Sequence, residues 1–244
     1  MATTPSRYRP PRLNGPERDF ARALRQVAKH VGALVQAFEP GRQEDLPTLT
    51  DMLRRYSDAL QDWAVRTAGR MLSTVDKRDQ STWAEHSREM ALSMREEIRN
   101  APTGKVLQRL LSEQVTLIKS LPIEAAERVH RLTLQGLEDG TRAKEIAREI
   151  GRTGEVTANR AMLIARTEVA RTASLLTEAR AEAVGSVGYV WRTSRDSDVR
   201  QSHREMEGKF VRWDKPPALS DGTVTHAGRI YNCRCYPEPV LPDL

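Results

Sequence analysis

The stretch TANRAMLIARTEVARTASLLTEARAEAVG, residues 157–185, decides the fold class of this chain. About 28 residues precede its closing glycine without an internal Gly or Pro, which is enough for a helix of about 42 Å. An apolar stripe recurs at helical spacing and is formed by Met162, Ile164 or Ala165, Val169, Ala173 and Leu176. Charged residues occupy the remaining positions. The stretch therefore predicts one long amphipathic helix and a mainly α-helical protein.

Helical periodicity extends upstream of this stretch. It predicts a helix from Glu17 to Phe38, ending at Pro40-Gly41, and further helices over 49–72, 82–98, 103–119, 122–138 and 142–150. Pro122 and Gly140 are the expected breaks between the last three, because proline and glycine interrupt helices. Each helix has one apolar face to bury, so we expect an N-terminal helical bundle.

After Gly185 the pattern changes to short strands. The segments VGYVWRTS, KFVRW and GRIYNCRC alternate β-forming residues and predict three strands. Between the first two, DSDVRQSHREMEG predicts a short helix capped by Asp196 or Ser197 and ended by Gly208. A small α+β module should therefore close the chain, with Trp191 and Trp213 buried in it.

These patterns divide the chain into four segments. We expect an extended Pro/Arg arm at 1–16, a helical domain at 17–138, connecting helices at 139–185 and the α+β module at 186–244. The arm contains four prolines, three arginines and no acid, so it is either a disordered tail or an arm that orders on a partner.

Composition limits the classes of function. The chain has 244 residues with a net charge of +6, which mildly favours an anionic neighbour such as DNA. It contains neither an apolar run of about 18 residues nor a secretion signal, so we expect a soluble protein made and kept in the cytoplasm. The pattern of residues 139–168 predicts two helices joined by a turn. This arrangement is either a helix-turn-helix DNA-binding motif or an ordinary boundary between helices.

The two cysteines of the chain, Cys233 and Cys235, stand one residue apart near its end. With His203 and His226 they could form a tetrahedral Cys₂His₂ zinc site, and the alternative is that both thiols are small buried packing residues. In an extended strand the two Cα atoms would be about 6.6–6.8 Å apart, so joint chelation needs a turn or bulge. Either way we expect both thiols to point inward near His203, with Arg234 facing outward or pairing with an acid.

An ordered series of residues in this region resembles the tailed-phage minor head proteins named after the F protein of phage Mu, also called the head morphogenesis family. The resemblance covers roughly residues 140–240 and rests on Arg166-Thr167-Glu168, Trp191, Asp196, Arg200, His203, Gly208, Asn232-Cys233-Arg234-Cys235 and Pro237. The chain departs from the family pattern at Asp198, where a basic residue is common, and at His226-Ala227, where His-Pro is common.

The resemblance implies a non-catalytic virion component, present in few copies inside the head at the portal vertex and needed for head morphogenesis or for DNA packaging or delivery. Its implied partners are the portal and other head proteins and, non-specifically, packaged DNA, with no membrane. We further expect the helical front, residues 17–138, to contact the portal. Arg166 and Glu168 should bond to the C-terminal module, with Arg166 reaching carbonyls or an acid such as Asp196.

A second class of function is open from the residues alone. His203 and the nearby acids could form a metal-dependent nuclease or hydrolase site, in which His203 is the general base and Asp196, Asp198, Glu205 and Glu207 hold the ion. Converging carboxylates in an open cleft would favour this enzyme, whereas a closed cysteine-lined site would favour a structural protein.

Overall fold

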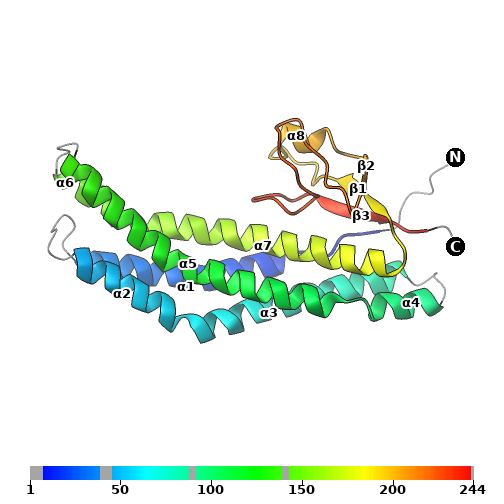
Figure 1. Cartoon of the computed structure of the whole chain (residues 1–244), viewed down its shortest axis with the longest axis horizontal. Coiled ribbons are helices and arrows are strands. Elements are labelled where there is room, and N and C mark those ends of the chain that lie inside the picture. Colours follow the sequence, from blue (N-terminus) through cyan, green and yellow to red (C-terminus); the bar gives the residue numbers. More distant parts are fainter. Residues whose placement is uncertain (1–7, 39–45, 88–91, 139–142, 243–244) are drawn as a thin grey trace. The chain divides into compact units, whose positions relative to one another are not determined.

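The computed structural model describes residues 8–38, 46–87, 92–138 and 143–242 (Figure 1). Its helices are α1 (Asn14–Gln36), α2 (Leu46–Ala59), α3 (Gln61–His86), α4 (Leu92–Arg99), α5 (Thr103–Glu138), α6 (Ala143–Gly151), α7 (Thr153–Ala183) and α8 (Gln201–Arg204). Its strands are β1 (Gly188–Arg192), β2 (Phe210–Arg212) and β3 (Tyr236–Val240). The predicted fold class, mainly α with long N-terminal helices and a small α+β C-terminal module, is confirmed. None of the described helices combines the length and apolar character needed to cross a bilayer.

The chain divides into two compact units that are not contiguous in sequence. Unit 1 consists of residues 1–17, 70–110 and 166–244, and unit 2 consists of residues 18–69 and 111–165. This differs from the four consecutive segments that the sequence predicts. The reason is that α1, α3, α5 and α7 each contribute one end to each unit.

Unit 2 is built from helices whose apolar stripes face inward. The stripe of α1 is buried as its periodicity predicts, at Phe20, Leu24, Val27, Val31 and Val35. Next to it, the backbones of Gly32 on α1 and Gly154 on α7 approach so closely that a Cβ on Gly154 would lie 2.8 Å from the Cα of Gly32. Two glycines therefore allow this helix crossing.

Helix α5 runs through Pro122, so the prediction of two helices separated by this proline is wrong. A proline inside a helix removes one backbone hydrogen bond and opposes continuation. Here the buried stripe continues on both sides of it, with Ile118 and Leu121 before and Ala125 and Val129 after. Tertiary packing of that stripe outweighs the local break.

The predicted helices at 49–72 and 82–98 are also placed differently. The first is divided at Leu60 into α2 and α3, and α3 then continues to His86. Its buried face extends from Ala64 through Val75 to Trp83, without a Gly or Pro after Gly69 to end it. The second prediction therefore corresponds to the end of α3 and to the separate α4.

Of the two interpretations of residues 139–168, the helix-turn-helix is not formed by the described part, residues 143–168. Only Arg152 separates α6 from α7, and α7 is 31 residues long. A helix-turn-helix needs a turn of about three to four residues between two helices. The ordinary helix boundary is the correct interpretation.

In unit 1 the strands form a three-stranded antiparallel sheet in the order β2-β1-β3. In the central strand, Tyr189 pairs with Val211 on one side and with Pro239 on the other. Figure 1 shows the sheet and α8 beside the C-terminal half of α7. Trp191 and Trp213 are 0% and 5% exposed, so their predicted burial is confirmed.

The third strand is not where the sequence predicts it. GRIYNCRC, residues 228–235, forms turns, and β3 follows it as Tyr236–Val240. Gly228 and Asn232 have positive φ angles of 78° and 54°, which an extended strand cannot contain. The cysteines therefore lie in a loop, which supplies the turn that joint chelation requires.

The short helix in DSDVRQSHREMEG is also smaller than predicted. Helix α8 has Arg200 as its N-cap residue, without a side-chain cap bond, so neither Asp196 nor Ser197 caps it. Asp196 instead accepts a bond from the backbone N–H of Asp198 and pairs with Arg234. Gly208, with a φ of 78°, stands at the predicted end of the segment.

Part of the predicted N-terminal arm is docked on unit 1, and residues 1–7 lie outside the described residues. The ring of Tyr8 is 6% exposed and lies edge-on to Trp83 and His86, with centroids 6.2 and 5.3 Å away. Its hydroxyl is 3.3 Å from the hydroxyl of Thr177. Helix α1 begins at Asn14, so residues 14–16 are helical rather than extended. Pro16 is compatible with this because proline is tolerated in a first helical turn.

Candidate functional site

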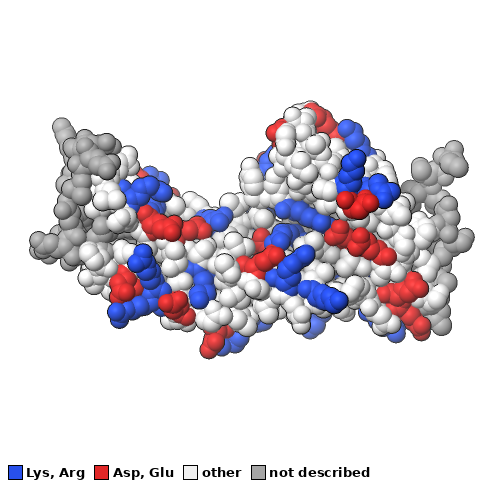
Figure 2. Space-filling model, in the orientation of Figure 1, with Lys and Arg blue, Asp and Glu red and all other residues white. Residues whose placement is uncertain are grey.

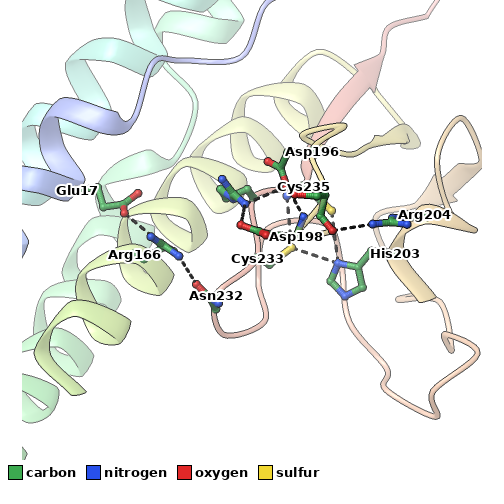
Figure 3. A network of polar contacts seen from close by, with 11 residues as sticks. Glu17, Arg166, Asp196, Asp198, His203, Arg204, Asn232, Cys233 and Cys235 are labelled. Carbon is green, nitrogen blue, oxygen red and sulfur yellow. Dashed lines mark hydrogen bonds and ion pairs between the residues drawn. The ribbon is translucent and has the colours of Figure 1, made fainter. Parts of the chain in front are cut away.

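His203, Cys233 and Cys235 form a buried group that we call the thiol–imidazole cluster. Each sulfur lies 3.4 Å from Nδ1 of His203, and the ligand atoms of all three residues are within 4.8 Å of one another (Figure 3). The exposed fractions are 2% for His203, 2% for Cys233 and 5% for Cys235. The prediction that both thiols turn inward near His203 is confirmed.

The loop before β3 brings the two thiols to one imidazole. The backbone N–H of Cys235 donates to Sγ of Cys233 at 3.4 Å, which turns the chain between them. A Cβ on Gly228 would lie 2.9 Å from the carbonyl oxygen of Cys235, so only glycine fits at that position. The sequence C-x-C therefore acts here as a tight turn and not as one face of a strand.

The spacing of the cluster fits a tetrahedral metal site. For a Zn–S bond of about 2.3 Å and a Zn–N bond of about 2.0–2.1 Å at a tetrahedral angle, the sulfur and nitrogen should be about 3.5 Å apart. Both measured separations are 3.4 Å. The three side chains can therefore hold one metal ion, with two sulfurs and one imidazole nitrogen as ligands.

His226 is not part of this cluster, although the sequence suggests it as the fourth ligand. Its Nδ1 lies 3.1 Å from the hydroxyl of Tyr189, and its ring is tilted against Trp213. The hydroxyl of Tyr189 also accepts the backbone N–H of Ala227. Burial, followed by the charge of Arg229, lowers the pKa of His226 to about 4. His226 is thus a neutral core residue.

The two thiols titrate as an interacting pair. The pKa of Cys233 is lowered to about 4, because the Cys235 thiol donates a hydrogen bond to its thiolate and His203 adds a further one, against the effect of burial. The pKa of Cys235 is raised, because its proton is held in the bond to Cys233 and burial disfavours a second thiolate. The cluster therefore presents one thiolate readily, which is the form that binds metal.

The imidazole is held in place by its surroundings. The ring of Trp191 packs edge-on against His203, with centroids 5.5 Å apart. The buried Nε2 of His203 has no hydrogen-bond partner among the described residues, so the polar contacts of the ring are made through Nδ1. Nδ1 is thus the atom that faces the sulfurs.

Arg166 joins three segments of unit 1. Its Nη1 donates to Oδ1 of Asn232 at 2.8 Å, and its Nε donates to Glu17 at 3.1 Å (Figure 3). Next to it, Thr167 accepts the backbone N–H of Asn232 at 3.0 Å. The prediction that Arg166 bonds to the C-terminal module is confirmed, but its partner is Asn232 and not Asp196.

Two further arginines of the motif also bond to or from this loop. Arg234 faces outward and donates to Asp196 at 3.0 Å and to Asp198 at 3.1 Å. Arg200 donates to the carbonyl of Tyr231 at 3.1 Å and stacks over its ring at 4.7 Å. Glu168 pairs with Arg171 on its own helix at 3.1 Å.

Carboxylates do not converge as a nuclease or hydrolase site would require. Asp196 and Asp198 both pair with Arg234, and Glu207 accepts bonds from the backbone N–H and hydroxyl of Thr193 at 2.7 Å each. Among the described residues, the thiol–imidazole cluster is the single group of three or more His, Cys, Asp and Glu spaced to hold a metal. A sulfur-rich site is typical of a structural role rather than of Mg²⁺-dependent hydrolysis.

Four buried or partly buried contacts near the site could not be predicted from the sequence. Arg180 donates to Asp79 and, at 2.7 Å, to Asp76, and Thr177 donates to Asp79 at 3.0 Å. Arg229 donates to Glu178 at 2.6 Å. These partners are separated by about 50 to 100 residues, and charge spacing within one helix cannot reveal them.

Comparison with known proteins identifies the C-terminal part of the chain. Residues 127–237 match the sequence model of a family described as Phage Mu protein F like protein. The minor head protein GP7 of Bacillus phage SPP1 is 25% identical over 152 residues, which are 56% of this chain and 49% of that protein. The resemblance to phage minor head proteins is thereby confirmed.

Two other proteins share a comparable length of sequence. An uncharacterized protein of Haemophilus influenzae is 37% identical over 148 residues, which are 60% of this chain and 32% of that protein. An NAD(+)--arginine ADP-ribosyltransferase, EFV, of Enterococcus faecalis is 30% identical over 166 residues, which are 62% of this chain and 33% of that protein. The chain thus spans about a third of these two relatives. No solved structure matches the chain significantly.

Proposed function

The chain contains a Phage Mu F-like region at residues 127–237, and from this we propose that it is a non-catalytic minor head protein at the portal vertex of a tailed phage. It lies inside the head in few copies and serves head morphogenesis and the packaging or delivery of DNA. One observation carries the proposal: residues of the motif contact one another directly, as Arg166 with Asn232 and Asp196 with Arg234 do.

A non-catalytic role is supported by the contacts that the acidic residues of the motif region make. The ion pairs of Arg234 and the bonds of Glu207 engage three of the four acids that the hydrolase hypothesis needs. The ADP-ribosyltransferase of Enterococcus faecalis shares only a third of its length with this chain, and its name describes the whole protein. Incubation of the purified chain with labelled NAD⁺ and an arginine-containing acceptor should leave the acceptor unlabelled, and labelling would contradict this part of the proposal.

The thiol–imidazole cluster serves as a structural zinc site that stabilises the small C-terminal module. A module with three short strands buries little apolar surface, so a metal that joins α8 to the loop before β3 would add stability. Elemental analysis of the purified full chain should find about one zinc per chain. The double variant Cys233→Ser/Cys235→Ser should bring that content to the background of the preparation.

The portal contact is assigned to the helical front, residues 17–138. Its support is the family resemblance together with exposed apolar side chains on its helices, Met52 at 36% and Val65 at 38%. Apolar side chains open to solvent on a regular helix are suited to a protein interface. Packaged DNA is the second partner, bound without sequence preference by contacts to phosphate.

The charge distribution limits how DNA is bound. On the face shown in Figure 2, Lys and Arg side chains are interspersed with Asp and Glu. Together with a net charge of only +6, this supports weak, salt-sensitive attraction to phosphate rather than a sequence-reading surface. Binding to duplex DNA should fall steeply between 50 and 200 mM salt, to a similar degree for unrelated sequences.

The main experiment is co-purification with the portal protein of the same phage. The full chain should elute with the portal, and quantitative mass spectrometry of intact particles should find it at few copies relative to the major capsid protein. The double variant Met52→Lys/Val65→Lys should weaken portal binding by about tenfold or more, because each lysine places a charge in an apolar contact.

The matched control is Val224→Lys, which places the same charge at a 61% exposed position of unit 1. It should leave portal binding unchanged. If Val224→Lys weakens binding and Met52→Lys/Val65→Lys does not, the contact lies outside the helical front. If the chain is missing from purified particles, the virion role itself is wrong.

A further inference from the structure

The thiol–imidazole cluster borders a cavity of about 610 Å³ within unit 1. We propose that a metal held by this cluster keeps its fourth coordination position open to the cavity and binds an exchangeable small anion there, such as a carboxylate. The inference rests on the metal site proposed above and adds to it the nature of the fourth ligand.

Among the described residues, the chain supplies only three soft or imidazole ligands at this place. Both of its cysteines are already in the cluster, and of its five histidines only His203 belongs to it. His226, the nearest candidate from sequence, is engaged with Tyr189. Among the described residues, no carboxylate joins the group either. A four-coordinate metal would therefore need one ligand from outside the described chain.

The cavity meets the thiol–imidazole cluster on its cysteine side. Cys233 and Cys235 line the cavity, whereas His203 is not among its lining residues. The imidazole side of the cluster is closed by Trp191. A bound metal would therefore have its cysteine ligands, and not its imidazole ligand, on the side of the cavity. A site with three protein ligands and one open position is the arrangement that binds exchangeable ligands, in contrast to closed four-ligand structural sites.

The size and the lining of the cavity suit a small ligand. Its floor is formed by small and apolar side chains of α7, including Val169, Ala170 and Ala173, and the segment from Tyr8 to Leu13 forms another wall. A volume of about 610 Å³ is within the usual range of small-molecule sites, about 300–1,000 Å³. A small ligand in this cavity would lie beside Cys233 and Cys235, both of which line it.

The charged residues that line the cavity are mainly positive. Four arginines line the cavity, Arg12, Arg78, Arg166 and Arg234, and Glu17 is the single acid among the lining residues. Arg166 and Arg234 have carboxylate partners, but Arg78 donates to the carbonyl of Arg12, and no carboxylate of the described residues pairs with Arg12 or Arg78. This excess of positive charge favours an anion over a neutral ligand.

The test uses the full chain loaded with Co²⁺, whose absorption spectrum reports its ligands. Cobalt bound by the cluster should give a near-ultraviolet band from its bonds to sulfur, and this band should be lost in Cys233→Ser/Cys235→Ser. Azide is the anion probe. Its addition should shift the visible cobalt bands in a saturable way while the sulfur band remains, because azide takes the open position without displacing the thiolates.

A matched pair of variants on α7 tests the role of the cavity. Ala170→Leu fills the cavity and should weaken azide binding by about tenfold or more, which corresponds to about 1.4 kcal/mol. Ala158→Leu introduces the same side chain at a partly exposed alanine of the hollow beside Gly32 and Gly154, and should leave azide binding unchanged. Arg12→Gln should weaken azide about two- to five-fold and leave binding of neutral imidazole unaffected.

The outcomes separate this inference from the metal site itself. If cobalt gives no sulfur band, both the metal site and the open position are wrong. If the sulfur band forms but azide and imidazole leave the visible bands unchanged, the metal site stands and the open position is wrong. If Ala170→Leu and Ala158→Leu weaken azide equally, the ligand does not enter through this cavity.

Discussion

Arg166 and Asn232, 66 positions apart in sequence, are joined by a hydrogen bond of 2.8 Å from the guanidinium to the side-chain amide oxygen. The same guanidinium holds Glu17 through a second nitrogen. One side chain on α7 thus ties the first turn of α1 to the turn that precedes both cysteines. That turn requires the left-handed conformation of Asn232, which this bond helps to fix.

Arg166→Lys should lower the free energy of unfolding by about 1 kcal/mol, because an ammonium group cannot hold both partners in the geometry of the guanidinium fork. Arg166 is 40% exposed, which keeps the expected effect small. Urea unfolding measures the change. Arg152→Lys, at an exposed position with partners only on neighbouring turns, is the control and should change stability by less than about 0.5 kcal/mol. Equal effects in both variants would contradict a bridging role for Arg166.

Cys233→Ser and Cys235→Ser should each destabilise the protein by about 1–3 kcal/mol, because a buried hydroxyl replaces a sulfur that contacts His203. Arg234→Gln, between them in sequence but exposed, should cost less than about 1 kcal/mol. Thermal unfolding with and without a chelator separates the contributions. A chelator that lowers the melting temperature of the wild type, and not of the serine variants, would assign the difference to metal.

His226 should make the protein less stable in mild acid. Its pKa is about 4 in the folded protein and about 6.5 when unfolded, so its contribution is present above pH 6.5 and is lost as the pH falls towards 4. Between pH 7 and pH 5 the loss should be about 2 kcal/mol. His226→Gln should have lower stability at pH 7 and a flatter stability profile over this range. An unchanged slope would show that His226 is not the group responsible.

Tyr8→Ala should destabilise unit 1 by about 3–5 kcal/mol, since it removes a buried ring that contacts Trp83 and His86. Tyr8→Phe removes only the hydroxyl that meets Thr177 and should cost about 1 kcal/mol. Chemical denaturation followed by tryptophan fluorescence measures both. If the two substitutions cost the same, the ring is not an anchor for the N-terminal segment.

Gly154→Ala should destabilise unit 2, because the new methyl group would meet the Cα of Gly32 at 2.8 Å and force α1 and α7 apart. The expected cost is about 1–3 kcal/mol. Gly151→Ala meets no atom within 4 Å and should be neutral or slightly stabilising, since alanine favours helix more than glycine does. Circular dichroism during thermal unfolding compares the two, and a neutral Gly154→Ala would mean that the crossing can open without loss.

Helical periodicity and short sequence motifs predict the parts of the fold that depend on residues close together in sequence. The buried stripe of α7 follows from helical periodicity except at Met162, which is exposed. The meeting of the cysteines with His203 follows from the rarity of cysteine and the family motif. Pro122 gives a wrong prediction of a helix end, because packing of the apolar stripe on both sides of it outweighs the loss of one helical hydrogen bond. The pairing of Arg180 with Asp79 could not be predicted, because the partners are 101 positions apart.

The third strand shows a different limit of sequence interpretation. Pro237 and Pro239 argue against a strand at residues 236–240, yet β3 forms there. It is an edge strand, and prolines two positions apart both turn their nitrogens to the same side, away from β1. The position of a strand within its sheet decides whether proline is tolerated, and a single sequence does not show that position.

The interleaving of the two units has a consequence for synthesis on the ribosome. All the residues of unit 2 precede position 166, so unit 2 can become compact while the chain is still being made. Unit 1 must bring Tyr8 and α3 together with β3. It cannot complete its packing until Val240 has left the ribosome. Its contacts are therefore non-local and slow to form, and its early segments remain exposed in the meantime. A stalled or truncated chain should consequently accumulate with unit 2 formed and the tryptophans of unit 1 accessible to solvent.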